Sequence, residues 1–181
     1  MTIEIVEFEL AEQHFAMDIQ NAREIVEMLP ITPIPHAPVH VTGMLNLRGE
    51  ITTIINIHSI LGIPHLRERQ DQKIVVLVPD VTDGANVGII VDDVQNVRNV
   101  DDHDINHNSS DIDNDIMNRY IKGIIKIQGD EEASRIDDQS GIHHLAQDSF
   151  DVTHSGSATK LLIWIDIEKI ILGINENSPS T

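Results

Sequence analysis

The chain has 181 residues, no cysteine, and an excess of acidic side chains that gives a formal net charge of −18. This length allows one ordinary core, and the lack of cysteine excludes a disulfide framework and a thiolate metal site. Nucleic acid is an unsuitable partner, because the charge repels phosphate and aromatic residues make up only 3% of the chain. No apolar run is long enough to span a membrane, and the N-terminus does not resemble a signal peptide, so we expect a cytoplasmic protein without membrane insertion.

Short apolar runs recur along the whole chain, and several alternate with polar residues at the period of two that is typical of strands. Isoleucine and valine dominate these runs, and their branched side chains favour a pleated sheet over a helix. Prolines and glycines separate the runs, most densely in LPITPIPHAP at 29–38. We therefore predict an all-β protein with short helical turns, whose strands lie within residues 3–10, 14–19, 43–47, 50–57, 73–78, 86–94, 120–127 and 160–167.

The chain also repeats itself. The segment between two glycines at 43–49 recurs at 123–129, and FAMDIQNAREI at 15–25 aligns with VGIIVDDVQNV at 87–97. Because the order of the repeated blocks is preserved, the pattern predicts an internal duplication. We expect a single domain, 1–175, made of two small β subdomains at roughly 15–62 and 74–172.

The two copies differ in length. Residues 130–159 stand where the first copy has a tight turn, and they are acidic, rich in serine, aspartate and glutamine, and without a sustained period. This composition indicates an exposed, mobile insertion within a hairpin. The last residues, 175–181, are predicted to form a frayed tail.

Several ordered blocks resemble one known family. HVTGMLNLRGEITTIINI at 40–57 is similar to the Asn-Leu-Arg-Gly segment of the CheW-like coupling proteins of chemotaxis, and the blocks at 15–27, 31–43 and 87–97 support the likeness. The resemblance implies two SH3-like five-stranded β-barrel subdomains and a non-enzymatic adaptor that requires no cofactor. The implied partners are the cytoplasmic tip of a chemoreceptor and the regulatory domain of a histidine kinase, with recruitment to membrane-bound receptor arrays.

A lone arginine in the first hairpin is the leading candidate for a binding residue. Arg48 lies beside Gly49 and can offer several fixed donors to a partner, or it can form an ion pair within the hairpin. Gly43 and Gly49 allow either the close approach of a partner backbone or a turn with positive φ, and the turn is the stronger explanation for Gly49. Asn46 is expected to order the hairpin through hydrogen bonds to the backbone.

Two further positions are implied by the resemblance alone. Ala22 and Glu24 correspond to family positions that face the receptor, although Glu24 could equally be a solvated charge. The chain departs from the family pattern at residues 53–56, where Thr-Ile-Ile-Asn replaces a segment that usually contains proline and aspartate. The detailed shape of that strand is therefore open.

The candidate metal ligands have unsuitable spacing, and the common enzyme motifs are absent from the sequence. The run from Asp111 to Lys122 begins like a calcium loop but lacks the glycine and the glutamate that such a loop requires. His103 and His107 have no third ligand at a suitable spacing. Phosphate-binding loops, nucleophile elbows and zinc-protease motifs are absent, so we predict neither a catalytic nor a metal site. A β-barrel module that binds a ligand or a metal outside chemotaxis is the alternative to the adaptor.

Overall fold

The computed structural model describes the whole chain except residue 67 and residues 108–114, 129–158 and 177–181. The predicted insertion, apart from Thr159, and most of the predicted tail fall outside the described residues. Among the helices that are described, none is long and apolar enough to cross a membrane.

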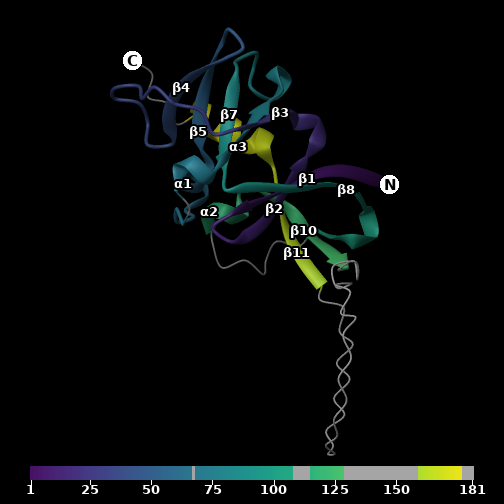
Figure 1. Ribbon diagram of the computed structural model, residues 1–181. Coiled ribbons are helices and arrows are strands. Elements are labelled where there is room, and N and C mark those ends of the chain that lie inside the picture. Colours follow the sequence, from purple (N-terminus) through teal and green to yellow (C-terminus); the bar gives the residue numbers. More distant parts are fainter. Residues whose placement is uncertain (67, 108–114, 129–158, 177–181) are drawn as a thin grey trace, which may run out of the picture.

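Two β-sheets make up the molecule (Figure 1). One has six strands in the order β8-β1-β2-β11-β10-β9, and the other has five in the order β3-β6-β7-β5-β4. The strands are β1 (Thr2–Leu10), β2 (Gln13–Asp18), β3 (Ala22–Glu27), β4 (Val41–Leu47), β5 (Glu50–Asn56), β6 (Lys73–Leu77), β7 (Val87–Val91), β8 (Asp93–Asp101), β9 (Ile105–Asn106), β10 (Ile121–Gln128) and β11 (Thr159–Ile165). The helices are α1 (Ile57–Leu61), α2 (Asp115–Asn118) and α3 (Ile167–Glu176), with 3-10 turns η1 (Ile19–Asn21), η2 (Arg69–Asp71), η3 (Pro79–Val81) and η4 (Asp102–Asp104).

The prediction of an all-β fold with two β subdomains is confirmed, but the sheets do not divide the chain at the predicted boundaries. Hairpin β6–β7, expected in the 74–172 subdomain, joins β3, β4 and β5 through the parallel pair β5–β7. Hairpin β1–β2 likewise joins β10 and β11 through the parallel pair β2–β11. The two halves of the chain therefore exchange hairpins, and local sequence patterns do not reveal such long-range pairing.

Three edge strands were also missed from the sequence, wholly or in large part: β3, β9 and the part of β8 beyond residue 94. β3 contains alternating charged residues, and β8 runs on past the predicted end at residue 94 through a mostly polar segment. Both are half-exposed strands at the edge of their sheet. Because an edge strand carries charged and polar side chains that limit unwanted pairing, its apolar signal is weak.

The pairing registers show how the halves correspond: β1 to β5 match β6, β7, β8, β10 and β11 in that order. Hairpins β4–β5 and β10–β11 each contain a bulge just before a glycine, Gly43 in one and Gly123 in the other. A Cβ atom at Gly43 would collide with the backbone oxygen of Thr32, and one at Gly123 would lie 2.8 Å from that of Asn106. These matched contacts support the predicted duplication.

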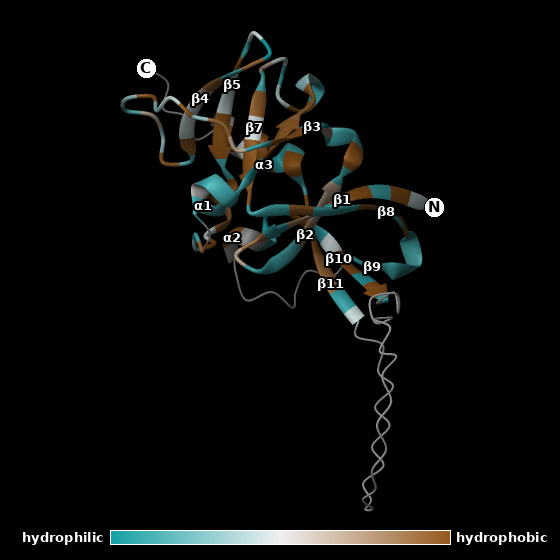
Figure 2. Cartoon of the chain, viewed as in Figure 1, coloured by the Kyte–Doolittle hydropathy of each residue, from teal (hydrophilic) through white to brown (hydrophobic). Residues whose placement is uncertain are grey.

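The largest hydrophobic core lies between the sheets and takes residues from both (Figure 2). Phe8 and Phe15, stacked with ring centroids 6.0 Å apart, supply its aromatic part, and Ile55 and Ile89 enter from the five-stranded sheet. Each sheet also encloses a smaller cluster of its own. The shared core therefore holds the two halves together by burial of aliphatic surface.

A buried polar hub also joins the halves. The Asp92 carboxylate, at the junction of β7 and β8, accepts hydrogen bonds from Ala11 N at 2.6 Å and Gln72 Nε2 at 2.7 Å, and lies 3.2 Å from His58 Nε2. Burial alone would raise the pKa of Asp92, but the hydrogen bonds from Gln72, Ala11 and His58 together hold that pKa below its ordinary value. Desolvation lowers the pKa of His58 even though Asp92 is beside it.

Candidate functional site

The two edges of the five-stranded sheet meet at a line of ion pairs that we call the seam. Arg48 Nη2 lies 3.0 Å from Glu24 Oε2, and Arg23 Nη1 donates to Glu50 Oε2 at 3.0 Å. Glu24 and Arg23 belong to β3 at one edge of the sheet, whereas Arg48 and Glu50 belong to the β4–β5 hairpin at the other. The sheet is therefore curled into a barrel, and the predicted residues Arg48 and Glu24 come together where it closes.

The hairpin turn fixes the position of Arg48. Leu47 pairs with Glu50, which leaves Arg48 and Gly49 as a two-residue turn with φ of 54° and 91°. Such a turn matches the twist of the strands and needs positive φ at both positions. Asn46 Oδ1 accepts a hydrogen bond from Gly49 N at 2.8 Å, as its predicted ordering role requires. No atom lies within 4 Å of a Cβ built at Gly49, so the turn explains this glycine.

Arg48 remains available to a partner. Its side chain is 78% exposed, whereas that of Glu24 is only 19% exposed. The Glu24 carboxylate therefore orients the guanidinium of Arg48, and the remaining N–H donors of the guanidinium face solvent. An exposed pair of this kind stabilises a fold by about 0–1 kcal/mol, so little stability is lost when the guanidinium turns toward a partner.

The other two predicted residues lie deeper. Ala22 is half-buried and packs against the shared core, beside the bulge that separates it from Glu24. Gly43 is buried, and the backbone that approaches it is the chain's own Thr32 segment, which also pairs with Met44. A contact within the chain therefore explains why residue 43 is glycine. The structure brings four of the six predicted site residues together at the seam.

Sequence reasoning missed an apolar face beside the seam. On the outer side of the β4–β5 hairpin Met44 is 36% exposed and Ile51, directly opposite Asn46, is 59% exposed. Ile25 of β3 is 39% exposed. Exposed methionine and isoleucine around an oriented arginine are typical of a protein-docking surface. We call Arg48, Glu24, Asn46, Met44 and Ile51 the seam face.

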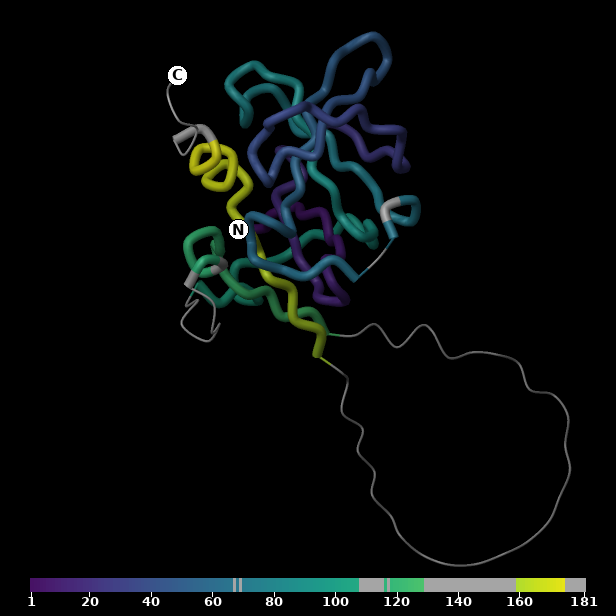
Figure 3. The backbone as a smooth tube through the Cα atoms, turned by 90° about the vertical axis from the view of Figure 1, so that its left-hand side faces the viewer, coloured from purple at the N-terminus to yellow at the C-terminus, as the bar shows by residue number. Residues whose placement is uncertain are grey.

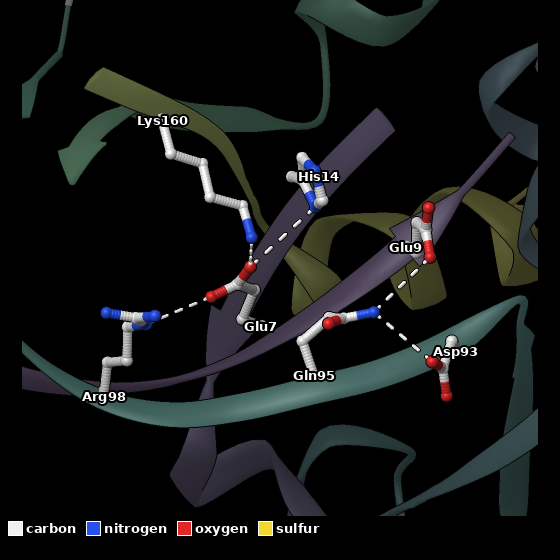
Figure 4. A network of polar contacts seen from close by, with 7 residues as sticks. All are labelled: Glu7, Glu9, His14, Asp93, Gln95, Arg98 and Lys160. Carbon is white, nitrogen blue, oxygen red and sulfur yellow. Dashed lines mark hydrogen bonds and ion pairs between the residues drawn. The ribbon is translucent and has the colours of Figure 1, made fainter. Parts of the chain in front are cut away.

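A second polar network lies inside the six-stranded sheet (Figure 4). The Glu7 carboxylate is fully buried, accepts from Arg98 Nε at 3.1 Å and from the Lys160 ammonium, and lies 3.8 Å from His14 Nδ1. Paired cations are what a buried carboxylate requires. The network joins β1, β2, β8 and β11 and leaves no open reactive position, so we assign it a structural role. The sequence did not reveal it because Arg98 and Lys160 lie far along the chain from the β1–β2 hairpin that carries Glu7 and His14.

One cluster of potential metal ligands occurs in the described part of the chain. Asp101, His103 and Asp104 have ligand atoms within 4.8 Å of one another on the exposed η4 turn. His107 is not a member of this cluster, and its Nε2 lies 3.8 Å from Asp102 Oδ1. Residues 111–114 of the calcium-loop segment fall outside the described ranges. Exposed acidic groups close together do not by themselves make a metal site, so this cluster carries no functional assignment.

Comparison with known proteins gives a consistent result. Residues 4–173 match the CheW-like domain. Chemotaxis protein CheW of Rhizobium meliloti is 34% identical over 130 residues, 70% of this chain and 79% of that protein. Chemotaxis protein CheW of Thermotoga maritima is 34% identical over 128 residues, with the same two shares. The crystal structure of the scaffolding protein TtCheW from Thermoanaerobacter tengcongensis matches with a TM-score of 0.63 at 27% identity, covering 91% of this chain and 89% of that one.

Proposed function

The chain belongs to the CheW-like domain family, and we propose that it couples the cytoplasmic tips of chemoreceptors to the regulatory domain of a histidine kinase, as a non-enzymatic scaffold in chemotaxis. In this role it is a cytoplasmic protein recruited to membrane-bound receptor arrays. The observation that carries the proposal is the seam face, where an exposed arginine is oriented by a half-buried carboxylate next to exposed apolar side chains.

The receptor tip is proposed to bind at the seam face. A helical tip offers carbonyl and carboxylate oxygens to the Arg48 guanidinium and apolar side chains to Met44 and Ile51. Glu24 holds the guanidinium in place before binding, so less side-chain entropy is lost when the partner arrives. Ala22, Gly43 and Gly49 contribute by shaping the strands and the turn that carry these groups.

The kinase is proposed to bind the six-stranded sheet. An open, mostly apolar cavity of about 510 Å³ lies over β10 and β11, lined by Ile124, Leu161 and Ile163. Leu161 is 53% exposed, and Lys126 and His14 also line the cavity. Exposed aliphatic side chains surrounded by polar groups are typical of a protein interface.

Coupling then consists of positioning. If one surface holds the receptor and another holds the kinase, a receptor rearrangement can shift kinase activity by at most the difference in binding free energy between the signalling states. No reacting group on the scaffold is needed. Weak single contacts are sufficient, because a multivalent array adds avidity.

Titration calorimetry with a receptor-tip fragment and with a kinase regulatory domain from the same organism tests the proposal. We expect the chain to bind both, and Arg48→Ala to weaken receptor binding by at least about tenfold with the kinase affinity unchanged. Arg23→Ala is the matched control, because it removes the neighbouring ion pair of the seam. Arg119→Ala removes one exposed positive charge at the start of the hairpin in the other sheet.

Different results reject different parts of the proposal. A chain that binds neither fragment, while divalent metal raises its melting temperature, would favour the ligand- or metal-binding module. Normal binding by the Arg48→Ala protein would reject the seam face and leave the scaffold function intact. If all three arginine variants weaken receptor binding equally, the cause is the loss of one positive charge and not the position of Arg48.

A further inference from the structure

We infer that the cavity between η1, η3 and α3 binds a lysine or arginine side chain from an extended segment of a partner protein. The cavity has a volume of about 440 Å³ and is open to solvent. Its lining residues come from η1, from η3 with the preceding Val78, and from α3, so it lies where the two halves of the chain meet. Figure 3 shows the yellow helix α3 beside the part of the molecule that contains β3 to β7. None of its lining residues belongs to the seam face, so the inference does not depend on the receptor contact.

An unpaired buried amide lines this cavity. Asn21 is 4% exposed, and its Nδ2 has no hydrogen-bond acceptor in the described structure. The backbone of the same residue is fixed, because Val78 N donates to Asn21 O at 3.0 Å. A buried donor without an acceptor destabilises the fold, because it has lost its hydrogen bond to water. A ligand that supplies a carbonyl oxygen would remove this cost, and a peptide backbone has such an oxygen beside every side chain.

Two carboxylates give the cavity its charge preference. Asp80, in the first turn of η3, and Glu168, in the first turn of α3, both line it. Neither forms an ion pair with another residue in the described ranges. The chain as a whole carries a formal charge of −18, which also attracts a cation toward this opening.

The apolar part of the lining distinguishes a long basic side chain from a bare ion. Val78 and Leu172 form part of the wall, and Leu172 is 59% exposed. Lysine and arginine lay an aliphatic stem along apolar surface while their charged end meets carboxylates. A metal ion gains nothing from such walls, and the three-ligand cluster of the described residues lies elsewhere, at η4.

The opposite half of the molecule shows what fills the equivalent place. In the matched registers Asp18 corresponds to Ile90, so Gln20 corresponds to Asp92, two residues further on. Glu168 corresponds to His58, since each lies two residues after the capping residue of its helix, Asp166 or Asn56. There the chain's own groups close the space, because Asp92 accepts from Ala11 N and Gln72. Around Gln20 and Glu168 the longer β6–β7 loop leaves a cavity instead. The open counterpart is therefore suited to groups supplied by another chain.

Nuclear magnetic resonance titration of the full chain with N-acetyl-L-arginine N-methylamide tests the inference. We expect saturable shifts of the Asn21 side-chain amide and of the backbone amides of Asp80 and Glu168, with a dissociation constant on the order of 1 mM. N-acetyl-L-citrulline N-methylamide has the same length and the same backbone oxygen but no charge, and it should bind at least about fivefold more weakly. The combined substitution Asp80→Asn and Glu168→Gln should abolish the preference between the two probes.

The control is Asp83→Asn, which removes a nearby charge outside the lining and should leave the titration unchanged. Asn21→Ala, checked for folding by its own spectrum, should weaken both probes equally because it removes the amide and not the charges. The absence of saturable shifts, equal binding of the two probes, or unchanged binding after loss of both carboxylates overturns the inference. Shifts of the same amides with magnesium chloride but not with the arginine probe would identify a metal site and also overturn it.

Discussion

The interiors of the two sheets differ at equivalent positions. Val76 of the five-stranded sheet pairs with Glu24 and Gly88, and Glu7 of the six-stranded sheet pairs with the matching Asn96 and Ala16. Val76 is 2% exposed in an all-aliphatic cluster, whereas Glu7 is equally buried but is held by Arg98 and Lys160.

The next strand repeats the contrast. Ile90 of β7 is buried among aliphatic residues, whereas its counterpart Asp18 of β2 accepts a hydrogen bond from Lys122 at 2.5 Å. Lys122 also lies over the Trp164 ring, 5.3 Å from its centroid.

The residues of the seam and their counterparts in the second half show the reverse distribution of charge. The first half closes with the charged pair Arg48 and Glu24, and the corresponding residues of the second half, Gln128 and Asn96, are both amides. At these equivalent positions one half therefore has its charges on the exposed surface and an apolar interior, and the other half has its charges inside. Because replacing a buried ion network by apolar residues is often close to neutral for stability, the two halves can differ in this way while their pairing scheme is the same.

The largest effect is expected from Val76→Glu, which places the carboxylate of the second half in the interior of the first. The residues that correspond to Arg98 and Lys160 are Val26 and Glu50, so neither of the two cations that pair with Glu7 has a basic counterpart there. We expect the free energy of unfolding to fall by more than about 4 kcal/mol in urea denaturation. Val76→Ala, which should cost about 2 kcal/mol through the cavity it leaves, separates the charge from the lost volume. Equal losses for the two variants would show that the interiors tolerate charge alike.

The next effect is that of Glu7→Ala. It leaves Arg98 and Lys160 without their shared carboxylate, and we expect a loss of about 2–3 kcal/mol in the same assay. The loss is smaller than for a fully buried pair, since the two basic side chains are 28% and 31% exposed and can turn to water. Glu7→Val copies the first half and should lose less than Glu7→Ala. If neither variant changes stability, the network is not structural.

Acid should weaken the junction between the halves. The pKa of His58 is lowered in the folded state, so stability falls as pH drops below the ordinary histidine value of about 6.5, where the unfolded chain gains a proton first. The pKa of Asp92 is also lowered, so a second loss begins near its ordinary value of about 4 and continues below it. Urea midpoints measured between pH 7 and pH 5 should decrease for the wild-type chain and decrease less for His58→Gln, which keeps a donor but cannot titrate. Parallel curves for the two proteins would contradict this assignment.

The strands that the sequence predicted correctly are those with a strong apolar pattern. The central strands were found because both of their faces are apolar, and β7 is buried at every position. The edge strand β3 and most of the edge strand β8 were missed because solvent allows charged and polar residues there, and the charges of β3 form part of the seam. The turn at Arg48 and Gly49 was predictable because two-residue hairpins have strict backbone needs. The pairing of Arg48 with Glu24 across the barrel was not, since it depends on closure of the whole sheet.

The smallest effect on stability, and the sharpest on function, is expected from Arg48→Gly. Arg48 has φ of 54°, a conformation that glycine adopts freely, and its ion pair with Glu24 is largely exposed. Thermal and urea unfolding should therefore show no loss, or a gain of up to about 1 kcal/mol. Receptor-fragment binding should nevertheless fall by at least about tenfold, as for Arg48→Ala. A clear loss of stability would mean that the arginine is kept for the fold, whereas unchanged stability with weakened binding means that it is kept, against the preference of the turn, for the surface that distinguishes the first half from the second.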